Sequence, residues 1–489
     1  MPTWNLANLT NLTNLCYVGG VVAIAEQSVA HTFSRAYPSY ASTRVLDELR
    51  AKEYPALAHH TYLDFTAGNL YATSQLTRHI ELLQRHLLGN PHSTNPASTT
   101  STDLIARARQ AVLRFFNASP DEWEIVFTSN ASQALKLVGE SYPFEAGDRF
   151  LLTFDNHNSV NGIREFARAR GATAGYVPIV LPEMRVDETD LVRGFETRRE
   201  GGHNLFAYPA QSNFSGVQHP LEWIARAHDH GWDVVLDAAA FTATNPLDLS
   251  AWAPDFVVQS FYKLFGYPTG VGCLLARKSA LAKLRRPWFS GGTITVASVQ
   301  GDKYYLAEGS SAFEDGTLDY LAIPAIEIGL QHIAALGIET IHERVRCLTG
   351  WLLDQLLPLT QTNGKPLVRL FGPPTTDRRG GIVTFNFYGA DGRAIDHRVV
   401  EQAANEANIC LRTGCFCNPG GGEIALGLTG TELSSCFRQR EPDAHFTVDD
   451  FRLCIDGKST GAVRVSLGMV SDVGDVDRFI TFAKGFIGR

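Results

Sequence analysis

The sequence has few of the features that mark secreted or membrane proteins. Its eight cysteines are scattered over 489 residues, which is too sparse for a disulfide framework and favours a reducing compartment. No lysine or arginine precedes Arg35, so the basic start of a secretory signal is missing. The apolar run at residues 15–25 is shorter than the roughly 20 residues that span a bilayer. We therefore expect a cytoplasmic protein that does not cross a membrane.

Strong charge of one sign is also missing. The chain has 43 basic and 51 acidic residues, a formal net charge of -8, and no basic stripe of the kind that binds nucleic acids. Its 44% hydrophobic and 19% charged residues are typical of a soluble globular protein. The length exceeds that of one ordinary core, which predicts two or three packed units.

Apolar runs and helical stretches alternate through the first half of the chain. This pattern, between residues 62 and 271, predicts an α/β domain with a largely parallel sheet. A long helical stretch then runs from about residue 322 to residue 357, with Pro324 suited to its first turn. Short strands and a final helix near residues 476–486 predict a smaller α+β domain. Residues 420–443 are rich in Gly, Thr and Ser, and we expect them to form a loop-containing insertion.

A small polar turn follows the predicted strand at residues 124–127. The turn, residues 128–132, contains Asn130, Ala131 and Ser132 and opens a helix. The first amides of a helix lack intrahelical acceptors, so a phosphate can bind there. Ser and Asn at such a turn are also ordinary N-caps, and both interpretations stay open.

An acid and a lysine follow neighbouring predicted strands. Asp237 ends the strand at residues 232–236, and Lys263 comes soon after the strand at residues 256–259. Ligands bind at the carboxyl ends of strands in open α/β sheets. A lysine, an acid and a phosphate-binding helix start are the parts of a pyridoxal phosphate site, in which the acid keeps the ring nitrogen protonated. An ion pair between Asp237 and Lys263 is the alternative.

Two thiols lie near a cation in a segment bounded by Gly and Pro. Arg412 precedes Cys415 and Cys417, and a short apolar strand comes before them. We expect an irregular, reactive segment after that strand, because loops on a rigid scaffold often carry chemistry. A scaffold protein with zinc on these two thiols plus Cys410 or Cys436 is the alternative, although structural zinc needs four ligands.

Four segments in combination carry a resemblance to a known family: residues 89–93 (Gly-Asn-Pro-His-Ser), residues 260–263 (Ser-Phe-Tyr-Lys), Asp456-Gly457 with Thr460-Gly461, and residues 412–419. The chain from about residue 33 onward resembles the N-terminal, cysteine-desulfurase-like domain of the molybdenum cofactor sulfurases. That family belongs to the class V aminotransferase group of fold-type I pyridoxal phosphate enzymes. The resemblance implies a mostly parallel seven-stranded sheet flanked by helices, a smaller α+β C-terminal domain, and pyridoxal 5'-phosphate as cofactor. The domains expected are an arm at 1–32, a segment at 33–75 packing with the small domain, a large domain at 76–325 and a small domain at 326–489.

The resemblance also implies roles for single residues around the cofactor. Lys263 would carry it as a Schiff base, Asp237 would face its pyridine nitrogen, and His157 would stack on its ring. A turn histidine that satisfies only local bonds is the alternative for His157. The further matches are Asn213 near the phenolic oxygen, Asn130, Ala131, Ser132, Ser260 and Tyr262 around the phosphate, and Thr293 reaching a neighbouring subunit's phosphate in a homodimer.

By the same resemblance, Cys417 is the cysteine that accepts sulfur. The implied reaction converts L-cysteine to L-alanine and leaves a persulfide on Cys417, with Arg464, Arg412 and Asn213 around the substrate. Only a thiolate is a competent nucleophile, so we expect Arg412 or a protonated His157 to lower the pKa of the thiol. Cys415 would be a neighbour that resolves or relays the persulfide.

Three departures from the family pattern leave substrate and acceptor open. The sulfurases carry a second, C-terminal domain, whereas this chain stops at Arg489. Ala240 stands where related desulfurases often have Gln or His, and Gly422 stands where the sulfurases have another cysteine. The alternative is a carbon-sulfur lyase, transaminase or epimerase that acts on a larger amino acid.

Overall fold

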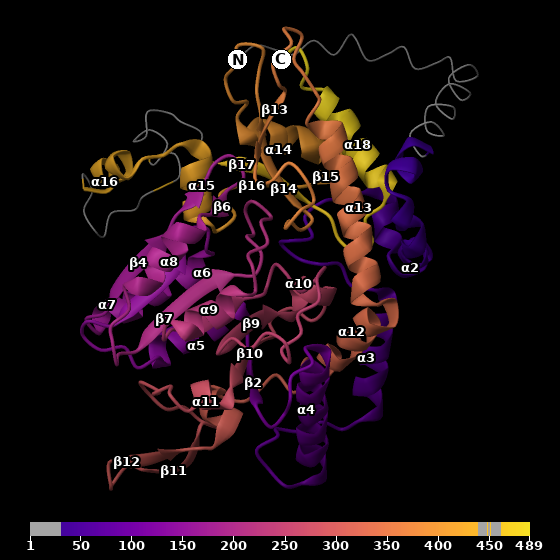
Figure 1. Ribbon diagram of the computed structural model, residues 1–489. Coiled ribbons are helices and arrows are strands. Elements are labelled where there is room, and N and C mark those ends of the chain that lie inside the picture. Colours follow the sequence, from indigo (N-terminus) through magenta and orange to yellow (C-terminus); the bar gives the residue numbers. More distant parts are fainter. Residues whose placement is uncertain (1–30, 439–446, 448–449, 451–460) are drawn as a thin grey trace.

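The computed structural model describes residues 31–438, 447, 450 and 461–489. Almost all of the expected arm at 1–32, and Asp456, Gly457 and Thr460 of the family motif, lie outside the described residues. A seven-stranded sheet forms the centre of the larger part (Figure 1). Its strands run in the order β2 (Trp123–Thr128), β10 (Gly272–Arg277), β9 (Phe256–Ser260), β8 (Asp233–Asp237), β7 (Asn204–Pro209), β3 (Arg149–Thr153) and β4 (Thr173–Val177).

The sheet is parallel from β9 to β4. Only β10 runs the other way, antiparallel to both β9 and β2. The expectation of a mostly parallel seven-stranded sheet is therefore confirmed. Its register pairs Asp237 with Val258, so β8 and β9 end at the same edge of the sheet.

Helices cover both faces of this sheet because its strands are apolar on both sides. In β7, Phe206 and Tyr208 pack into one core cluster, whereas Leu205 and Ala207 pack into the other. Such double burial is expected of a parallel sheet between helical layers. The first cluster contains residues of α4 (Pro96–Phe115), α8 (Glu188–Glu196), α9 (Trp223–Asp229) and α12 (Pro324–Leu336), and the second contains residues of α5 (Ala131–Ser141), α7 (Ile163–Ala169) and α11 (Lys278–Leu281).

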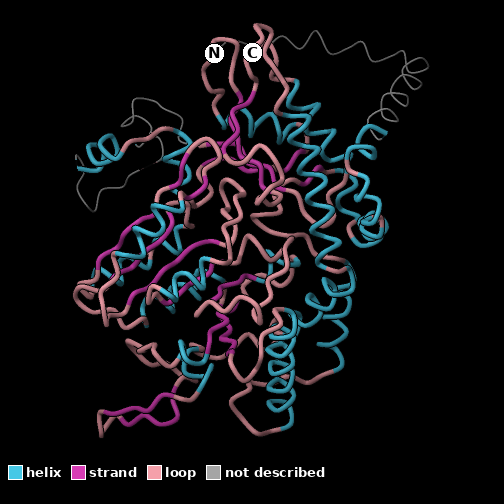
Figure 2. The backbone as a smooth tube through the Cα atoms, in the orientation of Figure 1, coloured by secondary structure: helices cyan, strands magenta, loops and turns pink. Residues whose placement is uncertain are grey.

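The smaller part is built on a four-stranded antiparallel sheet. Its order is β13 (Val368–Phe371), β14 (Ile382–Phe387), β17 (Ala462–Ser466) and β16 (Arg412–Gly414). Helices α13 (Ile338–Leu356), α14 (His397–Glu406) and α18 (Val473–Lys484) supply its core. The tube in Figure 2 shows the strands of this part gathered between helices.

The N-terminal segment packs against both parts, since Leu46, Tyr54 and Phe65 belong to the first core cluster of the large sheet. Phe33 is buried in the core of the small sheet, and β1 (Thr61–Tyr62) pairs in parallel with β15 (Ile409–Cys410). The remaining elements are η1 (Pro38–Thr43), α2 (Val45–Glu53), η2 (Pro55–His59), α3 (Thr73–Arg85), α6 (Asn158–Asn161), β5 (Ile179–Val180), β6 (Arg185–Val186), α10 (Phe261–Phe265), β11 (Ile294–Ser298), β12 (Lys303–Leu306), η3 (Gly309–Phe313), α15 (Pro419–Leu426) and α16 (Gly430–Arg438). Among the described residues, no helix is both long and apolar enough to cross a bilayer.

Two expectations about local structure were wrong. The long helix at 322–357 is two helices, because Gly337 has φ +79° and ends α12. The expected loop-containing insertion at 420–443 contains α15 and α16 in its described part, which the sequence analysis did not predict. Residues Arg412–Gly414 are not irregular, since they form β16 and pair with β17.

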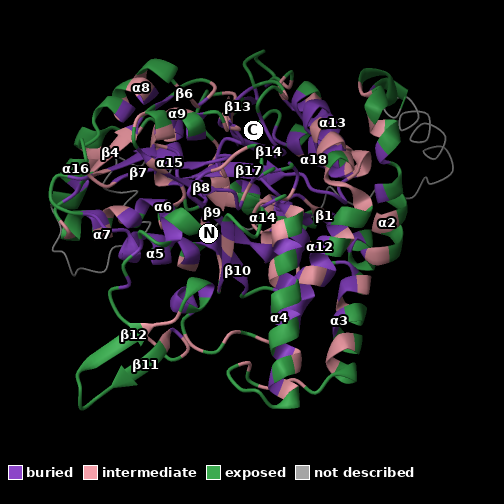
Figure 3. Ribbon diagram, turned by 60° about the horizontal axis from the view of Figure 1, so that its bottom comes forward, coloured by how far each residue is buried: buried purple, intermediate pink, exposed green. Residues whose placement is uncertain are grey.

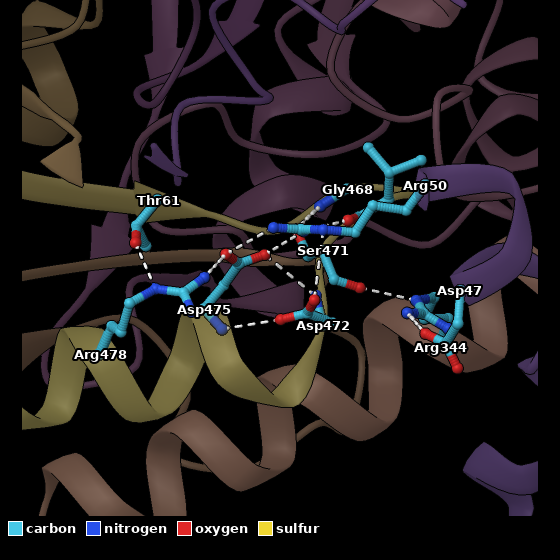
Figure 4. A network of polar contacts seen from close by, with 10 residues as sticks. Asp47, Arg50, Thr61, Arg344, Gly468, Ser471, Asp472, Asp475 and Arg478 are labelled. Atoms are coloured by element: carbon cyan, nitrogen blue, oxygen red, sulfur yellow. Dashed lines mark hydrogen bonds and ion pairs between the residues drawn. The ribbon is translucent and has the colours of Figure 1, made fainter. Parts of the chain in front are cut away.

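A buried ionic network ties the N-terminal segment to α18 (Figure 4). The Arg50 guanidinium donates to both carboxylate oxygens of Asp475, at 2.5 and 3.1 Å, and lies 3.2 Å from Asp472. Arg478 donates to Asp475 as well. The Asp475 side chain is only 1% exposed, so its charge depends on these partners.

We predict that Arg50→Ala weakens the fold. Removing one partner of a buried ion pair costs about 3 kcal/mol, because the other charge stays buried. Urea unfolding followed by circular dichroism measures the loss. The control is Arg85→Ala, which removes an exposed pair with Glu81 at 3.5 Å and should cost less than about 1 kcal/mol. Equal effects of the two substitutions would contradict the structural importance of the network.

Candidate active site

A cavity of about 370 Å³ lies at the carboxyl edge of the seven-stranded sheet. Cofactor sites in proteins are typically concave and of this size range. Most of the residues predicted from the sequence line this one cavity: Asn130, Ala131, Ser132, His157, Asn213, Asp237, Ser260, Tyr262 and Lys263.

Lys263 and Asp237 face the same cavity from adjacent strand ends. Lys263 lies in the one-turn helix α10 directly after β9, and Asp237 is the last residue of β8. Burial lowers the pKa of the Lys263 amine, while the nearby Asp237, Arg464 and Cys417 have smaller electrostatic effects on it. No ion pair joins Lys263 to Asp237 in the structure, so the alternative of a simple salt bridge is not supported. A lysine with a lowered pKa is a better nucleophile towards a carbonyl group.

The start of α5 forms one end of the cavity. Asn130 is its N-cap and accepts a hydrogen bond from the Gln133 amide at 2.9 Å. The Ala131 amide donates to the Ser260 hydroxyl at 2.8 Å, and this bond links the helix start to the end of β9. Gly272 permits the close approach of β10, because a Cβ there would lie 2.6 Å from Asn130 Cα. The cap interpretation and the anion-site interpretation are thus compatible, since a capped helix start still presents its dipole to the cavity.

His157 is held at the side of the cavity as the N-cap of α6. Its Nδ1 accepts a hydrogen bond from the Ser159 amide at 3.1 Å. Burial lowers the pKa of the imidazole, against a smaller opposing effect of Asp237. The lowered pKa favours the neutral ring, and the expected activation of the thiol by a protonated His157 stays a prediction. A neutral flat ring remains suited to stacking on an aromatic cofactor.

Arg464 lies beside the cavity in the middle of β17. Its guanidinium donates to the Asn213 carbonyl at 2.9 Å and to Asp64 at 3.3 Å, and it lies over the Phe416 ring at 4.6 Å. The Nε atom is buried without a hydrogen-bond partner among the described residues. Burial lowers the Arg464 pKa to about 10, so the side chain stays cationic at neutral pH. An incompletely paired buried arginine can bind a carboxylate.

Arg412 does not act as a free cation beside the thiols. It donates to both carboxylate oxygens of Asp64, at distances down to 2.7 Å. Asp64 therefore offsets much of the charge that was expected to activate Cys417. Because Asp64 also pairs with Arg464, it joins the two arginines into one charge cluster.

The two thiols lie in a tight four-residue turn. The Asn418 amide donates to the Cys415 carbonyl at 2.9 Å, and Phe416 and Cys417 have φ values of 57° and 55°. Both cysteines are exposed and free. A left-handed pair of this kind defines a type I' turn, which favours Asn and Gly over bulky residues.

The zinc alternative finds no support in the described part of the chain. Within it, no group of three or more His, Cys, Asp or Glu residues could hold a metal ion. Cys436, one of the suggested ligands, is disulfide-bonded. Because Cys436 is disulfide-bonded, not every cysteine is in the reduced form. The expected reducing, cytoplasmic compartment stays a prediction.

Thr293, the residue expected to reach a neighbouring subunit, directly precedes β11. It does not line the cavity, and its hydroxyl donates to the Ser290 carbonyl in its own loop at 2.8 Å. Asp64 and Asn418 also belong to the site but were not predicted from the sequence. Asp64 pairs with residues several hundred positions away and gives no local signal. Asn418 did give one, because Asn followed by Pro419 is a typical helix start.

Comparison with known proteins identifies the family. The family model described as aminotransferase class-V matches residues 61–479. The chain belongs to the class V aminotransferase family. This membership confirms the expected fold and pyridoxal 5'-phosphate as the cofactor.

Curated relatives of this class V chain are molybdenum cofactor sulfurases. The tomato protein (Solanum lycopersicum) is 39% identical over 92% of this chain and 58% of its own length. The human protein is 36% identical over 89% of this chain and 51% of its own length. The class V chain thus spans about half the length of the curated relatives it matches.

Solved structures share the class V fold. A cysteine desulfurase from Thermococcus onnurineus NA1 superimposes with a TM-score of 0.74 and 22% identity, covering 90% of this chain and 97% of that one. The cysteine desulfurase CsdA from Escherichia coli gives a TM-score of 0.71 and 20% identity, covering 90% and 98%.

The cavity of the class V chain fits this cofactor. Asp237 supplies a buried acid for a ring nitrogen, the start of α5 supplies an anion site, and Lys263 supplies an amine of lowered pKa. These three groups line a single cavity, which is the arrangement that a phosphorylated pyridine aldehyde requires.

We predict that Lys263 is the residue bonded to the cofactor. Borohydride reduction of the loaded protein should fix the cofactor on the peptide that contains Lys263. Lys263→Ala should abolish both this adduct and the visible absorbance of the bound cofactor, because no other amine lines the cavity in the described structure. Lys278→Ala, at an exposed lysine, is the control and should change neither signal. An adduct on another lysine would contradict the assignment.

Proposed function

We propose that the protein is a cysteine desulfurase or sulfurtransferase that converts L-cysteine to L-alanine and leaves a persulfide on Cys417. The observation that carries this proposal is an exposed thiol in a fixed turn, which is bonded to the cavity residue Asn213 through the Phe416 carbonyl and is near enough to Lys263 to affect the pKa of its amine. The sulfurase names of the curated relatives and the desulfurase names of the solved structures support it.

The side chains around the cavity have separate tasks in this proposal. Pyridoxal phosphate, when bound, supplies an electron sink that labilises bonds at the substrate Cα. Asp237 stabilises the positive charge on the ring nitrogen, and Arg464 binds the substrate carboxylate. Lys263, released by the substrate amine, takes up the Cα proton on its Nζ atom.

Cys417 performs the sulfur transfer. Its thiolate attacks the sulfur of the substrate, so that an S–S bond forms while the C–S bond of L-cysteine breaks. The electron pair of the broken bond and one proton from the site complete the methyl group of L-alanine, and Lys263 returns a proton to Cα. The outer sulfur stays on Cys417 as a persulfide, which a further thiol acceptor of unknown identity would remove.

Substitution of the two cysteines tests this function. Cys417→Ala should reduce alanine formation from L-cysteine at least about 100-fold, as expected for loss of a nucleophile. Cys415→Ala, two residues away in the same turn, is the matched control and should retain alanine formation. Amino-acid analysis of the products measures both. Pyruvate and ammonia in place of alanine, or full turnover by Cys417→Ala, would instead indicate a carbon-sulfur lyase.

We also propose a homodimer that uses the hairpin of β11 and β12. Figure 3 shows this hairpin projecting from the large part with exposed surfaces. Val296, Val299 and Tyr305 on it are 57%, 100% and 66% exposed, and exposed apolar patches of this kind typically mark protein interfaces. Thr293, which the family resemblance places against a neighbouring subunit, lies at the base of this hairpin.

We predict that the double substitution Val296→Asp and Tyr305→Asp converts the dimer to a monomer. Burial of two charged groups in the interface would be unfavourable. Sedimentation velocity measures the oligomeric state, and Val399→Asp, at an exposed residue of α14, is the control that should stay dimeric. A monomeric wild-type protein would overturn the dimer proposal.

A further inference from the structure

The turn that carries Cys417 is held in a conformation that its own residues disfavour. Phe416 and Cys417 both have positive φ, and each non-glycine residue in this region costs on the order of 1 kcal/mol. Such a conformation persists only when the surroundings fix it. The contacts that fix this turn therefore determine where the thiol lies.

The first three carbonyl groups of the turn are hydrogen-bonded. The Cys415 carbonyl accepts from the Asn418 amide at 2.9 Å, and the Cys417 carbonyl accepts from the Asn158 amide at 2.7 Å. The Phe416 carbonyl accepts from the Asn213 side chain at 2.7 Å. Two of these donors belong to the large part of the molecule, so the turn is bound to that part through its backbone.

The Asn418 side chain is the centre of this attachment. It is completely buried, and its Nδ2 donates to the Asp155 carbonyl at 2.6 Å and to the Asn213 side-chain oxygen at 2.9 Å. Its Oδ1 accepts from the Gly421 amide at 2.9 Å and caps α15. One amide group thus joins the turn, the loop before His157 and the loop of Asn213.

The same attachment reaches the substrate side of the cavity. The Phe416 ring lies under the Arg464 guanidinium, and Arg464 donates to the Asn213 carbonyl. Gly420 permits the fit, because a Cβ there would lie 1.9 Å from the Phe154 carbonyl oxygen. The thiol and the arginine that would bind the substrate carboxylate are consequently held by common partners.

We propose that Asn418 is a positioning residue for sulfur transfer, which holds Cys417 at the cavity through the two hydrogen bonds that its Nδ2 donates. This inference rests on the proposed desulfurase function. Asn418 does not contact the reacting atoms, and its effect is exerted through the turn. A displacement of about 1 Å at a reacting group can cost about 100-fold in rate.

Asn418→Asp separates positioning from helix capping. Aspartate caps a helix as well as asparagine does, so the bond to Gly421 can persist, but aspartate cannot donate to Asp155 or Asn213. We expect kcat for alanine formation to fall about 100-fold. The KM for L-cysteine and the absorbance of the bound cofactor should change little, because Lys263, Asp237 and Arg464 are untouched. The melting temperature should fall, because a buried carboxylate would face two acceptors.

Two further variants complete the test. Asn418→Ser should show the same loss of kcat, because serine is too short to reach both acceptors. Asn95→Asp, at the N-cap of α4, controls for the exchange of Asn for Asp and should keep the wild-type kcat. Either of two results overturns the proposal: full kcat in Asn418→Asp, or loss of cofactor absorbance and of the melting transition in both Asn418 variants. A wild-type protein that forms no alanine would instead refute the proposed function.

Discussion

The common edge at which β8 and β9 end is the constraint on which the rest of the site depends. Because the two strands are parallel and adjacent, Asp237 and Lys263 emerge together at the carboxyl edge of the sheet. The pairing of Asp237 with Val258 fixes which residues of the two strands lie side by side. Every other group of the site, from the start of α5 to the cysteine turn, is arranged around that edge.

The second requirement is that the smaller part of the molecule reaches the same edge. It contributes Arg464 from β17 and the turn after β16, and both contact Asn213 in the large part. Asp64, from the N-terminal segment, pairs with Arg464 and Arg412. This shared carboxylate offsets part of the charge of the two guanidinium groups, which matters most for the buried Arg464, since Arg412 is half exposed.

The sequence predicts the position of a site residue where that residue follows directly after a predicted strand. Asp237 and Lys263 are of this kind, because apolar runs define strands and parallel strands end at one edge. The long-range ion pairs of Asp64 could not be predicted, since nothing in the local sequence selects their partners. The same holds for the lowered pKa of His157, which follows mainly from its burial.

The helix ends that the sequence analysis did not predict have local causes. Gly337 lies inside a helical pattern and ends α12 through its positive φ, a known use of glycine at helix ends. In the insertion after residue 419, the Asn418 cap and Pro419 begin α15 despite its glycines. In both places a single end signal outweighed the average composition of the segment.

Sulfur transfer to Cys417 is the central claim, and a single turnover with isotopically labelled L-cysteine tests it most directly. The cofactor-loaded protein is mixed with L-cysteine that carries a heavy sulfur isotope, and the peptide with Cys415 and Cys417 is analysed by mass spectrometry. The account predicts one labelled sulfur on Cys417 for each molecule of L-alanine released. Labelled sulfide in solution, together with an unmodified Cys417, would contradict it.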